Sequence, residues 1–330
     1  MTEAEPVRFG VLGCAEIARR RMLPAIAAHP DAELAAVAAR EAHRAEETAR
    51  PYGCRAVGGY EALLADPDVE AVYVPLPNAL HADWVAAALD AGKHVLAEKP
   101  LTLEAERTAA LFATARERGL VLRENVMFLR HRQHARVREL LADGALGELR
   151  AFRAEFTVPA RPEGDIRHSP ALGGGALWDT GVYPVRAALH LLGPGLSVVG
   201  AVLRQDPRHG VDTAGSALLR TPDGAGVQLA FGIDHGYRSA YELTGELGRL
   251  VLDHAFTPPA GHVPRLRLER PGGVEELPLE PDDQVAGTVG AFAAAVRRGA
   301  GHRDRIEEEE SLRQAELLGE LARYGAPAGA

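Results

Sequence analysis

Cysteine is scarce in this chain of 330 residues, which contains only Cys14 and Cys54. Two cysteines are too few for a disulfide framework or for a metal site built from thiolates, so we expect both thiols to be reduced. The 13 histidines show no ligand spacing with enough carboxylate or thiolate partners for a metal site. We therefore predict a protein without a bound metal.

Long apolar runs and an excess of basic residues are also absent. No segment approaches the roughly 18 uninterrupted apolar residues of a membrane span, and residues 1–6 lack the basic and apolar blocks of a signal peptide. The formal net charge is −9, whereas nucleic-acid binding relies on basic surface that neutralises phosphates. These absences predict a cytoplasmic protein that binds neither a membrane nor nucleic acid.

The chain does contain enough apolar residues for two cores, since 46% of it is hydrophobic. Over its first third, short apolar runs alternate with longer Ala-, Glu- and Arg-rich segments. The alternation predicts strands at residues 7–12, 33–39, 71–74, 94–97 and 121–122 and helices at residues 16–28, 43–52, 61–64, 79–91 and 103–118. This pattern is typical of a mainly parallel sheet covered on both faces, with ligands at the carboxyl ends of its strands.

The pattern changes after about residue 124. Strands with few helices between them are predicted at residues 148–157, 197–203, 214–220, 226–233, 241–245, 249–253 and 265–270, and helices at residues 133–143, 284–298 and 306–324. We therefore predict an α/β domain with a mainly parallel sheet at residues 1–123. An α+β domain with an open, predominantly antiparallel sheet follows at residues 124–330.

The first strand leads into a loop that partly matches a dinucleotide fingerprint. Gly13 matches the first glycine of G-x-G-x-x-G, and Ala15 and Ala18 occupy the second and third glycine positions. Glycine suits this loop because the backbone must approach a pyrophosphate closely, and the single methyl of alanine is sometimes accommodated there. From this segment alone, an ordinary strand-to-helix turn is an equally good interpretation.

The end of the second predicted strand favours a phosphorylated ribose. An acidic residue there would bind the ribose hydroxyls of NAD, but Ala39 is followed by Arg40. Arg44, one helical turn later, adds a second positive charge, while Glu41 opposes phosphate binding. We therefore predict a preference for NADP(H). The alternative is that both arginines belong to a solvated face rich in glutamate.

Two further strand ends carry polar residues next to proline. Lys99 follows the apolar residues 95–97, and Pro100 favours extended backbone at Lys99 while fitting the first turn of a following helix. Lys99 is therefore predicted at the edge of a cleft. Pro77 precedes Asn78, which is well suited to cap the next helix. Capping is the simple alternative to a functional role for Asn78.

Three motifs together resemble those of the Gfo/Idh/MocA oxidoreductases, and their order and spacing extend over nearly the whole chain. They are Leu76-Pro77-Asn78-x-x-His81, Glu98-Lys99-Pro100 and Gly173-Gly174-Gly175-x-x-x-Asp179-x-Gly181-x-Tyr183. The resemblance implies that NADP(H) is bound by Gly13, Cys14, Ala15, Glu16, Ile17, Ala39, Arg40, Arg44, Leu76, Pro77, Asn78, His81, Glu98, Lys99 and Asn125. It implies that the substrate is bound by Lys99, Asn125, Phe128, Asp179, Tyr183 and His235.

One position separates branches of this family. Many members carry histidine where this sequence has Tyr183, which makes chemistry like that of inositol dehydrogenases less fitting. Tyrosine there resembles the glucose–fructose oxidoreductase branch and the ketoreductases that act on nucleotide-linked deoxysugars. Residues 124–129 and 235–243 particularly resemble the ketoreductases.

The chemistry of the third motif also follows from residue types. Asp179 and Tyr183 are four residues apart, so on a helix they share one face, and the glycines before them allow a close backbone approach to a ligand. A phenol with a usual pKa of about 10 is a poor proton donor unless a nearby ammonium, here Lys99, stabilises the phenolate. Tyr183 would then protonate the carbonyl oxygen as the nicotinamide delivers hydride to the carbonyl carbon, and Asp179 would orient a substrate hydroxyl. The alternatives are that Asp179 caps the helix and that Tyr183 is a half-buried packing residue.

The basic segment 130–138 has no interleaved aromatic residues of the kind that bind single-stranded nucleic acid. We expect most of it to be a solvated helix face, with His131 and His134 at the surface. One or two of its arginines are available to pair with the diphosphate of a nucleotide sugar.

The predicted function is NADP(H)-dependent reduction of the 3-keto group of a nucleotide-linked keto-deoxysugar. One alternative is a dehydrogenase of free sugars, polyols or dihydrodiols, and another is a cofactor-sensing regulatory protein without turnover. The resemblance implies that residues 1–123 form a dinucleotide-binding Rossmann domain and that residues 124–330 form a domain for substrate binding and oligomerisation. In the second domain, it implies that the exposed sheet face packs against a partner copy. We therefore expect a homo-dimer or homo-tetramer.

Overall fold

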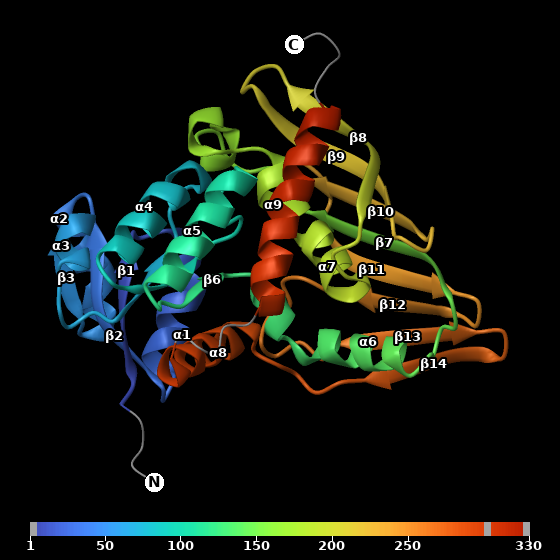
Figure 1. Cartoon of the computed structure of the whole chain (residues 1–330), viewed down its shortest axis with the longest axis horizontal. Helices are drawn as coiled ribbons and strands as arrows, with labels where there is room; N and C mark the ends of the chain where they lie inside the picture. The colour runs from blue at the N-terminus through green and yellow to red at the C-terminus, as the bar shows by residue number, and fades with distance from the viewer. Residues whose placement is uncertain (1–4, 300–304, 326–330) are drawn as a thin grey trace. The chain divides into compact units, whose positions relative to one another are not determined.

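The computed structural model describes residues 5–299 and 305–325, which form two compact units (Figure 1). Within these residues, unit 1 comprises residues 5–102, 106–127, 285–299 and 305–308. Unit 2 comprises residues 103–105, 128–284 and 309–325. None of the described helices is both long enough and apolar enough to cross a membrane.

Unit 1 is built on a parallel sheet of six strands in the order β3-β2-β1-β4-β5-β6. The strands are β1 (Val7–Leu12), β2 (Ala32–Ala39), β3 (Arg55–Gly58), β4 (Ala71–Val74), β5 (His94–Ala97) and β6 (Leu122–Glu124). The central strands β1 and β4 are almost entirely buried, as expected for a sheet with both faces covered. The predicted Rossmann domain is confirmed.

One strand of unit 1, β3, was not predicted from the sequence, and its position at the edge of the sheet explains why. β3 lies at the edge of the sheet and none of its residues is fully buried, so it lacks the apolar run that marks the other strands. The helices of unit 1 are α1 (Leu23–Ala28), α2 (Ala42–Ala49), α3 (Tyr60–Leu64), α4 (Asn78–Asp90), α5 (Ala105–Glu117) and α8 (Gln284–Arg298), together with a π-helical turn (Ala18–Met22) and a 3-10 turn (Arg50–Tyr52).

The last helix of unit 1 corrects the predicted domain boundary. The boundary after residue 123 lies close to the first crossing between units, at residues 127–128, but the chain later returns to unit 1. In α8, Val289 and Phe292 are fully buried in the core beneath β1, with the rings of Phe9 and Phe292 5.6 Å apart. The prediction was wrong here because an amphipathic pattern identifies a helix but not the core into which it packs.

Unit 2 contains an eight-stranded sheet in the order β14-β13-β12-β11-β7-β10-β9-β8. Its strands are β7 (Leu149–Thr157), β8 (Ser197–Asp206), β9 (Val211–Arg220), β10 (Gly226–Gly232), β11 (Arg238–Gly245), β12 (Arg249–Asp253), β13 (Arg265–Arg270) and β14 (Gly273–Pro278). Neighbouring strands are antiparallel except for β7 and β10, which are parallel. The predicted, predominantly antiparallel sheet is confirmed, and the missed strand β14 is again an exposed edge strand.

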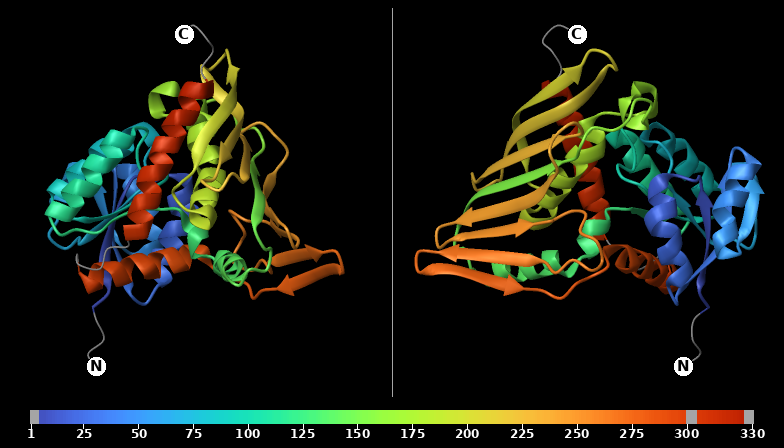
Figure 2. Two further views of the ribbon diagram at one scale, coloured as in Figure 1. Left: turned by 45° about the vertical axis from the view of Figure 1, so that its right-hand side comes forward. Right: turned by 180° about the vertical axis from the view of Figure 1, so that it is seen from behind.

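Helices cover one face of this sheet. They are α6 (Arg132–Ala142), α7 (Val182–Leu192) and, from residue 309 onward, α9 (Arg305–Gly325). α7 and α9 lie side by side on the covered face (Figures 1 and 2). Within the described part of unit 2, no helix lies on the opposite face, which the rear view shows as bare strands. Side chains on the two faces alternate along β7 and β9.

Candidate functional site

The loop after β1 needs glycine at one position. Gly13 has φ +113°, and its N–H donates to the carbonyl of Ala38 over 2.8 Å, which ties the loop to β2. A Cβ at this position would lie 3.0 Å from the Leu76 side chain, so the backbone is packed closely there. The chain turns helical from Glu16. The geometry therefore matches a dinucleotide-binding turn although alanine occupies Ala15 and Ala18.

Two arginines lie beside this loop at the end of β2. Arg40 directly follows β2 and Arg44 lies in the first turn of α2, and both are exposed. The Cys14 thiol donates to the Arg44 carbonyl over 3.4 Å, which joins the loop to α2. In the described ranges, neither guanidinium forms an ion pair with a neighbouring glutamate. Both side chains are exposed beside exposed glutamates, so the alternative of a solvated face stays open. Their positions fit an anionic group bound at this strand end.

His81 is fully buried behind the ends of β4 and β5. Its Nε2 lies 2.7 Å from the carbonyl oxygen of Leu76, and its Nδ1 lies 2.8 Å from that of Pro100. Burial lowers the pKa of His81, and the two carbonyls and the Glu98 carboxylate oppose that shift. Because both ring nitrogens face the protein, His81 holds the two predicted cofactor loops in place from behind.

Asn78 does not act as the helix cap that the alternative interpretation required. The capping position of α4 is taken by Pro77, and Asn78 is the first residue of the helix. Both residues are half-buried, and Leu76 before them is buried against Gly13. The predicted cofactor role of residues 76–78 therefore keeps its geometric support.

A buried polar network stands behind Lys99. The Tyr73 hydroxyl and the Asn125 amide each donate to Oε1 of Glu98 over 2.7 Å. Glu98 is 7% exposed and Asn125 is 1% exposed, so these bonds are shielded from water. The Oδ1 atom of Asn125 is buried without a hydrogen-bond partner in the described residues. A buried acceptor without a donor is costly, so this atom is a candidate for binding a ligand donor.

Lys99 is half-buried and lies just after β5, which ends at Ala97. The peptide bond between Lys99 and Pro100 is cis. The next helix, α5, starts at Ala105, close to the predicted start at residue 103, so Pro100 lies before it. The backbone between Pro100 and α5 is held in part by the Leu101 N–H, which donates to Oε1 of Glu124 over 3.0 Å.

In unit 2, Tyr183 lies within an aromatic cluster. Its ring centroid is 4.5 Å from that of Phe156, 5.7 Å from that of Phe256 and 6.1 Å from that of Phe128. Tyr183 is half-buried at the start of α7, whereas Phe128 is fully buried. The cluster fixes the orientation of the phenol. Phe128, a predicted substrate contact, packs near the Tyr183 ring with almost no exposed surface.

The start of α7 is held by a residue that the sequence did not reveal. Asp212, on β9, accepts a hydrogen bond from the Leu177 N–H over 2.7 Å. Burial raises the pKa of this carboxyl, and backbone N–H groups oppose the shift. Gly175, at φ +110°, leaves room for Asp212, and Gly174 packs on the Arg167 carbonyl. The glycines of the third motif therefore allow close packing within the protein.

Asp179 does not cap the helix, contrary to the simple alternative. It lies in a π-helical turn (Leu177–Gly181), and its Oδ2 accepts from Nε of Arg167 over 2.5 Å. Burial alone would lower the pKa of Arg167, but Asp179 and Asp165 outweigh it and raise that pKa. Arg167 comes from the long loop after β7 and had no sequence signal, since a lone loop arginine fits many roles.

His235 and the basic helix complete the predicted residues. His235 is exposed, pairs with Asp234 over 2.7 Å and donates its backbone N–H to Val158. His131 and His134, predicted at the surface, are each 1% exposed, so that prediction was wrong. His134 contacts the Tyr241 hydroxyl and the Ala255 carbonyl, each at 2.9 Å, and burial lowers its pKa to about 3. The prediction failed because a polar residue such as His134 does not mark the buried face of a helix, although it lies on that face in α6.

No group of three or more His, Cys, Asp or Glu residues in the described ranges is arranged to hold a metal ion.

The predicted site residues fall into two sets, one in each unit. Those of unit 1 gather at the carboxyl ends of its parallel strands. In unit 2, Asp179 and Phe128 lie near Tyr183 at the start of α7, and His235 lies in the loop between β10 and β11.

Comparisons with known proteins agree with this geometry. Residues 7–126 match the family model "Oxidoreductase family, NAD-binding Rossmann fold", and residues 134–251 match the "GFO/IDH/MocA C-terminal domain". A dTDP-3,4-didehydro-2,6-dideoxy-alpha-D-glucose 3-reductase of Streptomyces antibioticus is 51% identical, covering 94% of this chain and 95% of the relative. The enzyme of the same name from Streptomyces violaceoruber is 54% identical, covering 94% and 93%.

Among solved structures, KijD10 resembles the chain along nearly its full length. KijD10 is a 3-ketoreductase from Actinomadura kijaniata, solved in complex with NADP and TDP-benzene. It is 49% identical with a TM-score of 0.94, covering 97% of this chain and 98% of KijD10. Family models and relatives thus agree over both units, and the chain belongs to the Gfo/Idh/MocA oxidoreductase family.

Proposed function

We propose that this protein is an NADP(H)-dependent ketoreductase that reduces the 3-keto group of a nucleotide-linked keto-deoxysugar. The observation that carries the proposal is the 51% and 54% identity to two dTDP-sugar 3-reductases over almost the whole chain. The NADP in KijD10 supports the choice of cofactor. The two free cysteines, Cys14 and Cys54, are consistent with a cytoplasmic location.

Unit 1 supplies the cofactor site in this proposal. NADPH, when bound, supplies the hydride. Gly13 would let the loop backbone approach the diphosphate closely, since this residue has no Cβ. Arg40 and Arg44 would pair with the 2′-phosphate by charge-assisted hydrogen bonds. Residues 76–78, held by His81, and the Asn125 Oδ1 atom would line the nicotinamide end.

Unit 2 supplies the proton donor. The Tyr183 hydroxyl would protonate the carbonyl oxygen as hydride reaches the carbonyl carbon, and Lys99 would stabilise the phenolate and polarise the carbonyl. The aromatic cluster around Tyr183 supports this role because it restricts the ring to one orientation. Asp179, which is paired with Arg167, would orient a substrate hydroxyl.

The activity test is to mix the protein with NADPH and a dTDP-linked 3-keto-deoxysugar and to follow absorbance of the reduced nicotinamide. We expect turnover with this substrate and none with free sugars or polyols. Tyr183→Phe should lower kcat about 100-fold or more while the Kd for NADPH changes little, because general acid catalysis typically contributes factors of this size. Near-normal kcat in this variant would remove the proposed role of Tyr183.

A second candidate is oxidation of free sugars, because a D-xylose 1-dehydrogenase (NADP(+)) of Haloferax volcanii is 39% identical over 96% of this chain. Turnover of NADP with D-xylose but not with the nucleotide-linked ketone would favour this candidate. Cofactor binding without turnover of any substrate in the panel would favour the regulatory alternative.

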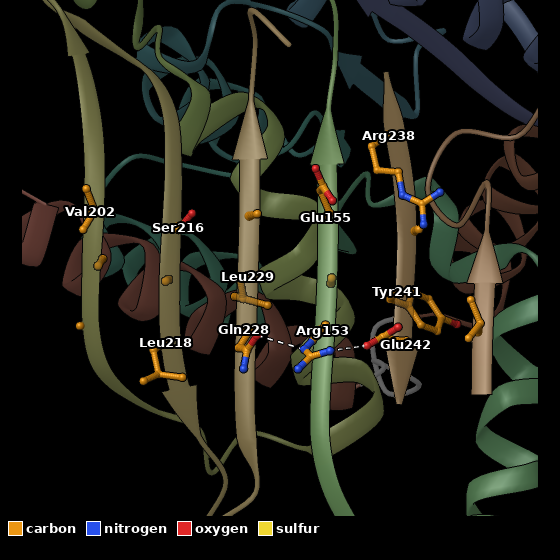
Figure 3. A pocket seen from close by; sticks show the side chains of 17 residues that line it. Arg153, Glu155, Val202, Ser216, Leu218, Gln228, Leu229, Arg238, Tyr241 and Glu242 are labelled. Carbon is orange, nitrogen blue, oxygen red and sulfur yellow. Dashed lines mark hydrogen bonds and ion pairs between the residues drawn. The ribbon is translucent and has the colours of Figure 1, made fainter. Parts of the chain in front are cut away.

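We also propose that the bare face of the unit 2 sheet packs against a second copy of the chain. This face holds a groove of about 950 Å³, with charged and apolar side chains side by side (Figure 3). Arg153 donates to Gln228 and Glu242 over 3.0 Å each, and Val202 nearby is 71% exposed. Interspersed charges of both signs around apolar residues suit an isologous contact, in which the same patch meets itself.

Light scattering after gel filtration tests this contact. We expect a dimer or a tetramer for the wild type and a smaller species for Val202→Glu. Val263→Glu is the matched control, since Val263 is 51% exposed but lies outside the groove. A monomeric wild type, or equal effects of both variants, would contradict the proposal.

A further inference from the structure

Tyr60, which the sequence did not single out, lies beside the candidate dinucleotide loop. It is the first residue of α3 and follows Gly59, whose φ is +91°. The Gly59 N–H donates to the carbonyl of Ala39 over 2.9 Å. This hydrogen bond holds Tyr60 next to the end of β2, where Arg40 begins the connection to α2.

The ring of Tyr60 is packed so that its hydroxyl faces the loop. Tyr60 is 8% exposed and makes an edge-on contact with Trp84, with ring centroids 4.9 Å apart. A Cβ built on Gly13 would lie 3.6 Å from the Tyr60 hydroxyl oxygen. The Tyr60 hydroxyl therefore lies close to the loop backbone at Gly13.

Charged groups of both signs lie within electrostatic reach of this hydroxyl. Burial raises the pKa of Tyr60, Cys14 and Glu41 add to that shift, and Arg40 and Arg44 oppose it. The phenol therefore stays protonated at neutral pH and acts as a donor. No residue in the described ranges accepts a hydrogen bond from it, although the hydroxyl of a buried tyrosine usually finds a partner.

We propose that the Tyr60 hydroxyl donates a hydrogen bond to the 2′-phosphate of NADP(H), as a third ligand beside Arg40 and Arg44. This inference rests on the proposed function, because it takes NADP(H) as the cofactor. A phosphate monoester supplies acceptors that the protein lacks here, and two guanidiniums with one neutral donor match its several oxygens. The hydroxyl group, fixed by Trp84, would then contribute to discrimination between NADP(H) and NAD(H).

The test compares Tyr60→Phe with the wild type in fluorescence titrations with NADPH and with NADH, in the absence of any sugar. We expect the Kd for NADPH to rise about tenfold, since hydrogen bonds to charged groups are worth that much. The Kd for NADH should change less than twofold. Tyr52→Phe is the matched control, because it removes a hydroxyl from the same unit at a half-buried position beside Cys54, and it should change neither Kd.

The outcomes separate this inference from the proposed function. An unchanged Kd for NADPH, or equal rises in Kd for both cofactors, would overturn the role of Tyr60. Neither result would bear on the proposed function, which is tested separately by turnover of the dTDP-linked ketone. Selective loss of NADPH affinity would support Tyr60 even if no nucleotide-linked ketone were reduced. The NADH titration also shows that the variant is folded, because that cofactor requires the same loop.

Discussion

The two units hold their candidate site residues by different means. In unit 1, Glu98 binds Tyr73 and Asn125, and all three residues lie on or just after neighbouring strands of one sheet. In unit 2, the helix that carries Tyr183 is fixed by Asp212 from β9 and, through Arg186, by α9. Regular strand order therefore positions the first site, whereas contacts between distant segments position the second. The two kinds of support should respond differently to substitution.

The largest effect is expected from Arg186, three residues after Tyr183 on α7. It is 1% exposed and donates to Gln314 over 2.9 Å and to Ser311 over 2.7 Å, both on α9. Arg186→Ala should lower the free energy of unfolding by about 3–5 kcal/mol, because it removes the arginine of a buried ion pair and leaves His190 as the remaining described partner of Glu310. Urea denaturation checks this loss. Arg138→Ala, on an exposed position of α6, should change stability by less than about 0.5 kcal/mol.

The next effect concerns the glycine that makes room for Asp212. Gly175→Ala would place a Cβ against the Asp212 carboxylate at a φ of +110°, so we expect a loss of about 1–3 kcal/mol and a lower kcat. Gly53→Ala is the control, since Gly53 has φ +66° but open space around it, and should cost about 1 kcal/mol with kcat unchanged. Equal effects in both variants would show that backbone conformation alone matters.

A smaller effect is expected for the network of unit 1. Tyr73→Phe removes one of the two described side-chain donors to Glu98 and leaves the Asn125 amide, so we expect a loss of about 1–2 kcal/mol. The Kd for NADPH should rise modestly, as Glu98 adjoins Lys99. Thermal unfolding and cofactor titration check both values. A loss as large as that of Arg186→Ala would contradict the view that unit 1 relies on its sheet.

The smallest effect is a pH dependence at the surface of unit 2. His209 lies 2.6 Å from Asp206 and 3.3 Å from Glu163. These hydrogen bonds raise the pKa of His209 above its usual 6.5 and lower those of Asp206 and Glu163 below 3.8 and 4.5. The contribution of protonated His209 to the stability of this region is thus complete below pH 6.5 and is lost as the pH rises through its raised pKa. That of the carboxylates is lost as the pH falls through their lowered pKa values.

Hydrogen exchange measures this dependence. Amides in the loop around Glu163 should exchange more slowly between pH 4.5 and 6.5 than above this window, after correction for the intrinsic pH dependence of exchange. His209→Asn should remove the difference. An unchanged profile in that variant would assign the pH dependence to other groups.

The sequence predicted unit 1 better than unit 2 for a physical reason. Buried parallel strands leave apolar runs, so residues at their ends, such as Arg40 and Lys99, could be located directly. Tyr60 was missed because α3 is short and because the Tyr60 side chain packs near Gly13, in a loop that is distant in the sequence. Arg167 and Asp212 were missed because each contacts the site only through tertiary packing. The burial of His134 was missed because a polar residue does not mark a buried helix face.

The return of the chain to unit 1 has a consequence for synthesis. The core under β1 requires Val289 and Phe292 of α8, which the ribosome makes only after the whole eight-stranded sheet of unit 2. During translation, unit 1 therefore exposes the apolar surface that α8 later covers until the chain of unit 2 has been completed. A fragment ending at residue 127 would lack part of its own core, so the cofactor-binding half should be produced as a stable protein only when α8 is attached to it.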